Sequence, residues 1–382
     1  MYALVIGRAF PDEKTGMMGI FEFEQARALN KHGLKSVYAF CDTRSIKLLR
    51  KLNYVELNQD NVPVYGYHFP IGGMPQYSFD KLKTNRFKKI LKKIVNNHGI
   101  PDIIHVHFPL LNINNDIWRL LKNFEKPIII TEHWTKVQNK TIESFRINLL
   151  KKVVEESDSF ICVGAPLKKS VIELTNTNKS IYVVPNMVSP LFYYERQLSN
   201  TDTFNFTAVG RLVEVKRFGL VIQAFAKAFP NIENIHLNIV GGGPLYPDLK
   251  KQINNMGLNN RVNMHGFLSR EETAEIIRKS DAYVSASVLE TFGVPFIEAM
   301  VSGLPVIGVK NGPIDNYINH SNGILFEKDN LDHLVNSLQK LYENRKKYDN
   351  KQIAFDAEQI FSEVAVTEKL KDIYKQHTKI KL

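Results

Sequence analysis

Two glutamates eight positions apart, Glu290 and Glu298, surround a Gly-Val-Pro step that is typical of a loop running into a helix. The free N–H groups and the positive dipole end of such a helix start suit a phosphate group, and Gly293 lets the backbone approach a ligand closely. We expect Glu290 on the loop and Glu298 in the first helical turn, where each could hold different hydroxyls of one extended ligand. Taken alone, the two glutamates are better explained without a ligand: Glu290 would be solvated, and Glu298 would interact favourably with the helix dipole.

A second group of residues favours the ligand-binding interpretation. Gly210 stands at the end of an apolar run, and Arg211 and Lys216 follow within one loop. A planar guanidinium and a compact ammonium together can neutralise a departing diphosphate without a divalent metal. No Asp-x-Asp, the usual metal-chelating pair, occurs in the sequence. Without the glutamates, a solvated basic loop before a helix would fit about equally well.

The elements that must position these residues follow an α/β pattern, because short Val- and Ile-rich runs alternate with stretches of helical period. A helix from Phe23 to His32 is expected to end at Gly33. In the first half the expected strands are Tyr2–Ile6, Ser36–Phe40, Ile103–Val106, Ile128–Thr131, Ser159–Val163 and Ile181–Val184. In the second half they are Asn205–Val209, Leu237–Val240, Val262–His265, Ala282–Ala286 and Val306–Val309. Both halves therefore predict Rossmann-like parallel sheets, which bind ligands at their carboxyl edges.

The length of 382 residues indicates about two domains. The polar, irregular stretch from Ser189 to Thr203 is the expected linker. We predict an N-terminal domain over residues 1–187 and a C-terminal domain over 188–358. A helix from Gln359 to Gln376, within the last segment 359–382, lies beyond the final strand signal and is free to pack back on the N-terminal domain.

Charge is distributed unevenly within the formal total of +11. Residues 1–190 carry 27 Lys and Arg against 17 Asp and Glu, whereas the rest carries 23 against 22. This excess points to a polyanionic partner of the first half: a nucleic acid, an anionic membrane or a phosphate-bearing substrate. Cys41 and Cys162 are too few for a disulfide framework, and neither a signal peptide nor a membrane span is recognisable, so we expect a cytoplasmic protein.

The motifs together resemble those of the family 4 glycosyltransferases, a retaining group with the GT-B fold. The resemblance rests on two glutamates with seven residues between them and on Gly-Arg-Leu-x-x-x-Lys, here residues 290–298 and 210–216. Similar elements are Val184-Pro-Asn186, Val240-Gly-Gly-Gly-Pro244, His265-Gly-Phe267, Ser280-Asp-Ala282, Gly16-Met-Met-Gly19 and Pro101–His107. One loop departs from the family pattern, because Asn311-Gly-Pro-Ile-Asp315 replaces the frequent Gly-Gly-x-Pro-Glu. The resemblance implies two Rossmann-like domains that face each other across a cleft, with the acceptor bound by the N-terminal domain (1–187) and the nucleotide-sugar donor by the C-terminal domain (188–358).

Site roles follow from the resemblance, residue by residue. Arg211 and Lys216 would bind the donor pyrophosphate, Glu298 the ribose hydroxyls, and Glu290 the sugar near the reacting carbon. His133 would contact the sugar from the other domain, whereas His105 and His107 are expected to be structural. The remaining expected donor-binding residues are Gly19, Gly210, Gly266, Phe267, Leu268, Thr291, Phe292, Gly293 and Val294.

The implied reaction moves a hexose or N-acetylhexosamine from a nucleoside diphosphate sugar, with a UDP-sugar favoured, to a hydroxyl of a glycan acceptor. No metal and no cofactor are expected. Because no carboxylate nucleophile is evident, retention implies front-face attack with the departing diphosphate as proton acceptor. The vaguer resemblance of the loop Pro11–Gly16 to enzymes that build bacterial surface polysaccharides suggests a polyprenyl-diphosphate-linked acceptor.

The stretch from Lys81 to Val95 combines seven basic residues with apolar Phe87, Leu91 and Ile94. It could lie on the inner face of an anionic plasma membrane. An ordinary amphipathic helix that packs Leu82 and these three residues inward fits equally well.

Rival functions differ in class. No nucleic-acid-binding domain is recognisable, and Gly241-Gly-Gly-Pro-Leu-Tyr246 lacks the third glycine of a dinucleotide-binding fingerprint. A GT-B sugar-nucleotide epimerase and a catalytically silent nucleotide-sugar-binding scaffold remain as alternatives to the transferase.

Overall fold

A computed structural model describes residues 2–11, 17–45, 52–195, 202–310, 312 and 314–378. The described residues leave out most of the loop 11–16, including Gly16. They also leave out Asn311 and Pro313 of the loop 311–315, which departs from the family pattern. The chain divides into two compact units: Met1–Met187 with Glu363–Leu382, and Val188–Ser362. We call them the N-terminal and the C-terminal unit.

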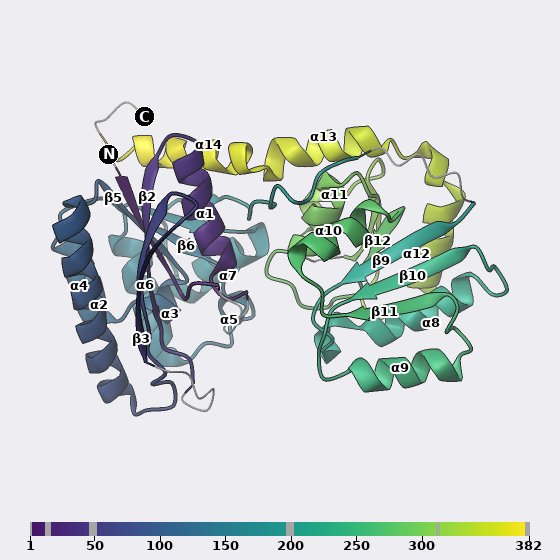
Figure 1. The fold of residues 1–382 in the computed structure, drawn as a ribbon, viewed down its shortest axis with the longest axis horizontal. Helices are drawn as coiled ribbons and strands as arrows, with labels where there is room; N and C mark the ends of the chain where they lie inside the picture. The colour runs from purple at the N-terminus through teal and green to yellow at the C-terminus, as the bar shows by residue number, and fades with distance from the viewer. Residues whose placement is uncertain are drawn as a thin grey trace. The chain divides into compact units, whose positions relative to one another are not determined.

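The N-terminal unit is built on an eight-stranded sheet with the order β3-β4-β2-β1-β5-β6-β7-β8 (Figure 1). All described pairings in it are parallel except that of β3 with β4. The strands are β1 (Tyr2–Gly7), β2 (Lys35–Asp42), β3 (Asn53–Gln59), β4 (Val62–His68), β5 (Ile103–His107), β6 (Ile128–Glu132), β7 (Ser159–Cys162) and β8 (Ile181–Val183). Six of them match the expected strands within two residues. The hairpin β3–β4 was missed because its outer strand is polar and almost wholly exposed.

Helices cover the N-terminal sheet. They are α1 (Ile20–Lys31), α2 (Gln76–His98), α3 (Pro109–Asn112), α4 (Asn115–Lys122), α5 (Thr135–Gln138), α6 (Ser144–Glu156), α7 (Ala165–Thr175) and α14 (Glu363–Lys375). The last of these, α14, packs on α1 and buries Val366, Leu370, Ile373 and Tyr374 in the core of this unit. The prediction of one continuous helix over 359–376 was wrong, because α13 of the other unit ends at Phe361 and α14 begins after Ser362.

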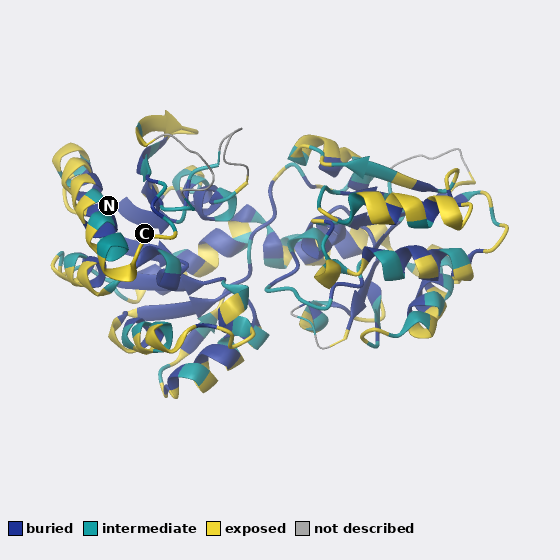
Figure 2. Ribbon diagram, turned by 90° about the horizontal axis from the view of Figure 1, so that it is seen from below, coloured by how far each residue is buried: buried dark blue, intermediate teal, exposed yellow. Residues whose placement is uncertain are grey.

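The C-terminal unit has a six-stranded, wholly parallel sheet with the order β11-β10-β9-β12-β13-β14. Its strands are β9 (Phe204–Val209), β10 (Ile235–Val240), β11 (Val262–Gly266), β12 (Ala282–Val284), β13 (Val306–Val309) and β14 (Gly323–Phe326). Its helices are η2 (Glu214–Lys216), α8 (Phe218–Ala228), α9 (Tyr246–Asn255), α10 (Arg270–Arg278), α11 (Val294–Val301), η3 (Asp315–Tyr317), α12 (Leu331–Glu343), η4 (Arg345–Lys347) and α13 (Asn350–Phe361). Figure 2 shows the buried strands and the exposed outer faces of the helices.

The strand order of each sheet reverses at one point, which lies between β1 and β5 in the first sheet and between β9 and β12 in the second. Loops that leave neighbouring strands in opposite directions open a crevice at such a point, where α/β sheets bind ligands. Gly210 follows β9 and Glu290 lies in the loop after β12, so the two principal motifs of the sequence meet at the second reversal.

Helix α2 contains the basic stretch from Lys81 to Val95. Its Phe87, Ile90, Leu91 and Ile94 are buried, as expected for an amphipathic helix packed on the sheet. Leu82 is half-buried, and Lys81, Lys88, Lys89, Lys92 and Lys93 are exposed. Within the described ranges, no helix combines the length and apolarity that a membrane span requires.

Candidate active site

A cavity of about 460 Å³ lies at the carboxyl ends of β9, β10 and β11 in the C-terminal unit. The structure brings four expected donor-binding residues together in its wall: Gly210, Arg211, Phe267 and Leu268. The rest of the wall is Val209, Val240, Gly241, Gly242, Gly243 and Thr273. The size falls within the range of small-molecule pockets.

Two glycines of the β10–α9 loop make this wall possible. A Cβ atom on Gly241 would lie 1.9 Å from the carbonyl oxygen of Gly210, and one on Gly243 would lie 2.4 Å from that of Leu212. The loop can therefore press against the loop after β9 only without side chains at these positions. The Gly-Gly-Gly run thus serves close backbone packing beside the cavity.

Lys216 and Glu290 form an ion pair although 74 positions separate them. The pairing depends on two loops held together by a hydrogen bond of 2.9 Å from the N–H of Val288 to the carbonyl oxygen of Val215. The Lys216 side chain runs beside Gly210, since a Cβ atom there would lie 3.8 Å from Lys216 Cε. The ammonium and the carboxylate therefore stand together next to the cavity, whereas sequence reasoning gave them separate roles.

Glu298 is paired as well. Its Oε1 lies 3.2 Å from Arg270 Nη2, and the carboxylate is largely buried. The expected place of Glu298 in the first helical turn was wrong, because α11 begins at Val294 and makes Glu298 its fifth residue. Sequence reasoning also missed Arg270, which begins α10, because nothing in the local sequence shows which carboxylate an arginine 28 positions away will meet.

The charges of Glu290 and Glu298 both affect the pKa of Tyr283, a buried residue of β12. Burial raises the pKa of the Tyr283 hydroxyl, and the negative charges of Glu290 and Glu298 raise it further. The hydroxyl donates a hydrogen bond of 3.5 Å to the carbonyl oxygen of Val209 at the end of β9. Tyr283 thus stays protonated and lies within the electrostatic reach of both carboxylates.

The start of α11 has the expected form. Gly293 is its N-terminal cap with a left-handed φ of 89°, and a proline follows in the first turn. Thr291 and Val294 are half-buried beside it. Phe292 is 2% exposed and packs edge-on against Tyr317 and Phe361, so its side chain belongs to the core of the unit.

Two exposed side chains flank the cavity. Arg211 is exposed, and Phe267, directly after Gly266 and β11, is 78% exposed. A guanidinium there can bind a phosphate, and an exposed aromatic ring offers a surface for stacking a flat base. The neighbouring His265 is structural, since its Nε2 lies 2.9 Å from Asn238 Oδ1.

His133 lies in the N-terminal unit, directly after β6. Its Nε2 is 2.9 Å from His107 Nδ1, and the Asn186 side chain forms a further hydrogen bond with it. Burial lowers the pKa of His133 well below its usual value, and the charge of Arg8 lowers it further. His133 is therefore a neutral imidazole held in a fixed orientation.

His133 belongs to a group of three buried histidines, together with His105 and His107. His105 contacts the Tyr374 hydroxyl at 2.6 Å and the Thr131 hydroxyl at 2.7 Å, which is a structural role as expected. His107, also expected to be structural, contacts the candidate catalytic imidazole of His133. Burial is the main cause that holds the pKa of both His105 and His107 well below the usual range.

Arg8 is the residue of this region that sequence reasoning missed. It follows β1 and forms a salt bridge of 2.7 Å with the buried Glu22. Its guanidinium lies 3.4 Å above the ring of Phe108, which in turn stacks on His133 at 4.6 Å. Its place after the first strand of a parallel sheet was the available signal.

Gly19 has a packing reason for its identity. It caps α1 with a left-handed φ of 91°, and a Cβ atom there would lie 1.9 Å from the carbonyl oxygen of Ala9. Its role toward a donor stays a prediction. Among the described residues, no cluster of three or more His, Cys, Asp or Glu side chains could hold a metal ion.

Two family models match the chain. The model described as Glycosyltransferase Family 4 matches residues 21–190, and that described as Glycosyl transferases group 1 matches residues 193–354. The N-acetyl-alpha-D-glucosaminyl L-malate synthase of Bacillus anthracis is 28% identical over 228 residues. That match covers 57% of this chain and 59% of the relative, so the chain spans about three-fifths of its length.

Solved structures with this fold cover almost the whole chain. The sucrose-phosphate synthase of Thermosynechococcus elongatus has a TM-score of 0.77 at 19% identity and covers 98% of this chain and 99% of its own. Anabaena HepE in complex with UDP-glucose has a TM-score of 0.71 at 18% identity, with coverage of 98% and 100%. These neighbours confirm the expected fold class, the GT-B arrangement of two parallel-sheet domains.

Proposed function

We propose an activity for this chain from one premise: it belongs to the glycosyltransferases, with its first half in family 4 and its second half in group 1. The proposed reaction transfers a hexose or N-acetylhexosamine from a nucleoside diphosphate sugar to an acceptor hydroxyl, with retention of the anomeric configuration. UDP is the favoured nucleotide, because HepE was solved with UDP-glucose. N-acetylglucosamine is the favoured sugar, because the Bacillus anthracis relative is named for it.

The observation that carries the proposal is the gathering of the C-terminal motifs at one sheet reversal. Arg211, Lys216 and Glu290 come from loops after β9 and β12, and they lie in or beside the cavity of about 460 Å³. Cations, a carboxylate and an exposed aromatic ring in one place match the three parts of a nucleotide sugar: diphosphate, sugar and base.

The chemistry assigned to the chain is positioning and charge stabilisation. Arg211 and Lys216 would hold the growing negative charge of the departing diphosphate, since fixed cations stabilise developing charge in place. Glu290, already paired with Lys216, would orient the sugar hydroxyls. Glu298 would bind the ribose hydroxyls while Arg270 fixes its direction. We propose that no divalent metal takes part, so that turnover should survive chelation with EDTA.

Acceptor and location are further parts of the proposal. We assign the enzyme to bacterial capsule, exopolysaccharide or related cell-surface glycan synthesis, with a lipid-linked acceptor at the inner face of the plasma membrane. The exposed lysines of α2 support this assignment, whereas its buried apolar side chains leave only electrostatic attraction. Flotation with anionic liposomes should therefore be lost at high salt, and equal flotation with neutral liposomes would contradict the assignment.

Thermal unfolding with a panel of UDP- and GDP-sugars, followed by detection of released nucleoside diphosphate, tests the donor. A binding ligand raises the melting temperature by mass action, so the panel identifies the nucleotide. Release of UDP only in the presence of acceptor supports the transferase. Conversion of the sugar without release of UDP would instead indicate an epimerase, and binding without any conversion a silent scaffold.

A further inference from the structure

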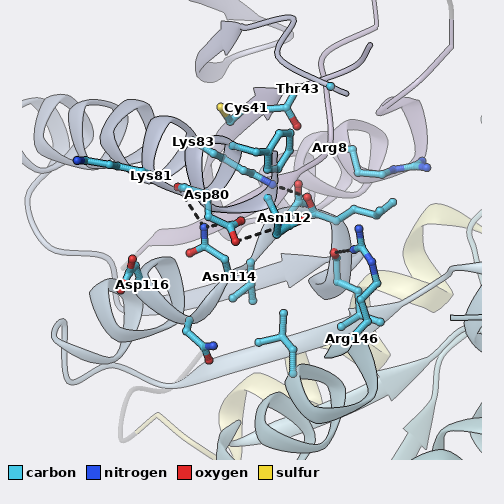
Figure 3. Close-up of a pocket in the computed structure, with 18 of the residues that line it drawn as sticks. Arg8, Cys41, Thr43, Asp80, Lys81, Lys83, Asn112, Asn114, Asp116 and Arg146 are labelled. Carbon is cyan, nitrogen blue, oxygen red and sulfur yellow. Dashed lines mark hydrogen bonds between the residues drawn. The ribbon is translucent and has the colours of Figure 1, made fainter. Parts of the chain in front are cut away.

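A second and larger cavity, of about 790 Å³, lies wholly within the N-terminal unit (Figure 3). Helices α2, α3 and α6 contribute to its wall, together with the loops after β1 and β2. The basic stretch from Lys81 to Val95 contributes Lys81 and Lys83 to this wall, although its sequence pattern does not predict a cavity. Its volume falls within the range of small-molecule binding sites.

Lys83 of α2 is buried in the wall of this cavity, with 3% of its surface exposed. Its ammonium donates a hydrogen bond to the backbone carbonyl of Leu111 in α3. Among the described residues no carboxylate lies within ion-pair distance of it. Burial lowers the pKa of Lys83 to about 8, so the group still carries its charge at neutral pH.

Arg146 of α6 reaches the same short helix from the opposite side. Its Nη1 donates a hydrogen bond of 2.6 Å to the carbonyl oxygen of Leu110, the residue before Leu111. Figure 3 shows both side chains directed at this part of the wall, whereas Lys81 extends away from it. Two cations from separate helices thus converge on one turn of backbone.

Lys83 and Arg146 each use one hydrogen bond to cap a backbone carbonyl of α3. An ammonium has three donors and a guanidinium five, so donors are left for another partner even though Arg146 Nε also pairs with Glu143 at 2.9 Å. Burying a charged ammonium without a carboxylate partner is energetically unfavourable. A neutral donor would cap a carbonyl without that cost.

The aspartates of the wall are engaged elsewhere. Asp42 accepts a hydrogen bond of 2.8 Å from Arg44, Asp80 accepts bonds from Gln76 and Asn114, and Asp116 pairs with Arg119 at 3.2 Å. Arg146 has Glu143 as an ion-pair partner at 2.9 Å, whereas the buried Lys83 feels the charge of Asp80 without forming an ion pair with any described carboxylate. The charge of Lys83 is therefore only partly compensated. An anionic ligand would supply the missing charge.

Large apolar side chains stand at the rim. Phe145 beside Arg146 is 52% exposed, and Tyr77 at the start of α2 is 78% exposed. Both line the same cavity. Exposed aromatic rings next to a buried charge fit a ligand with an anionic head and an apolar remainder.

We propose that this cavity is the acceptor site and that it selects acceptors carrying an oxyanion, a phosphate or a carboxylate, which binds Lys83 and Arg146 while an apolar part lies along Tyr77 and Phe145. The assignment as acceptor site rests on the proposed transferase function. The anion preference itself does not depend on it.

The test compares three probes with the same six-carbon chain: hexyl phosphate, hexanoate and hexan-1-ol. Calorimetric titration measures their affinity for the whole protein and for Lys83→Met and Arg146→Gln. Lys88→Met is the matched control, because Lys88 lies on the same helix, is exposed and does not line the cavity. Removing a charge-assisted hydrogen bond corresponds to about a tenfold to hundredfold loss of affinity.

The wild type and Lys88→Met should bind at least one anionic probe tenfold or more tightly than the alcohol, and the tighter anion identifies the head group. Lys83→Met and Arg146→Gln should each reduce that preference to about threefold or less. An unchanged preference in both variants, or equal binding of alcohol and anions by the wild type, would overturn the proposal.

Release of UDP from the donor is measured on the same proteins. If Lys83→Met abolishes anion binding but no sugar nucleotide ever yields UDP, the transferase proposal fails and the anion site stands. If UDP is released and both Lys83→Met and Arg146→Gln behave as the wild type toward the three probes, the anion site alone fails.

Discussion

Replacing Lys216 by methionine removes one charge from the proposed leaving-group site and keeps most of the apolar stem. Lys216 and Glu290 have side chains that are 20% and 18% exposed, so their interaction is partly shielded from water. Loss of one fixed donor to a developing oxyanion typically lowers kcat by about 10² to 10³, which is about 3–4 kcal/mol. We expect a loss of this size in Lys216→Met.

Folding should suffer less than catalysis. Glu290 loses its ammonium partner in a partly buried place, which costs about 1–3 kcal/mol of the free energy of unfolding. Urea titration measures that change, and coupled detection of UDP measures turnover. The affinity for UDP should fall by about tenfold, since one charge-assisted contact to the diphosphate disappears in the ground state as well.

The neighbouring cation provides the control. Arg217 is 41% exposed and pairs with Asp329 at 3.1 Å, a surface pair worth at most about 1 kcal/mol. Arg217→Gln should change kcat by less than about threefold. If Lys216→Met is folded and turns over within about threefold of the wild type, or if Arg217→Gln is equally damaged, the assignment of Lys216 to the leaving group is wrong.

Four further predictions concern single sites. Phe267→Ala should raise the dissociation constant for UDP by about tenfold through lost base stacking, with folding unchanged; equal affinity in a titration would exclude stacking. Gly241→Ala should destabilise the C-terminal unit, because its Cβ atom would lie 1.9 Å from the Gly210 carbonyl oxygen; an unchanged midpoint of denaturation would refute this packing argument. His133→Ala should lower kcat without weakening UDP binding, and unchanged turnover would remove it from the site. Burial raises the pKa of Glu132 from 4.5 to about 7, so the folded state retains a proton that the unfolded state releases. The resulting stabilisation is complete below pH 4.5 and lost as pH rises through 7; Glu132→Gln should flatten this part of the stability profile, and a profile identical to the wild type would contradict the assignment.

Sequence reasoning predicted the buried parallel strands well because their continuous Val and Ile runs leave little ambiguity. It missed β3, since Asn53–Gln59 is a polar edge strand that is paired only with β4. It also joined α13 and α14, because only Ser362, with neither glycine nor proline, separates two helices that pack in different units. Local pattern carries no information about which unit a helix will cover.

The sequence motifs predicted which residues form the site, but not which of those residues contact each other. Gly210, Arg211, Phe267 and Leu268 line one cavity as their motifs suggested. The pairing of Lys216 with Glu290 depends on β9 lying beside β12, an order that spacing along the chain does not reveal. Arg8 escaped notice, and Lys83 was counted with the basic stretch from Lys81 to Val95, although it is buried. The reason is the same, since each residue acquires its role from elements distant in sequence.

The most direct test of retaining sugar transfer by this enzyme follows the nucleotide and the sugar of the donor in one experiment. UDP-N-acetylglucosamine carrying a carbon-13 label in the sugar is incubated with the enzyme and an acceptor, and NMR records free UDP and the configuration at the labelled anomeric carbon. We predict that UDP and an α-linked product appear in equal amounts, and that Lys216→Met slows the formation of both. A β-linked product, or consumption of the donor without UDP release, would contradict it.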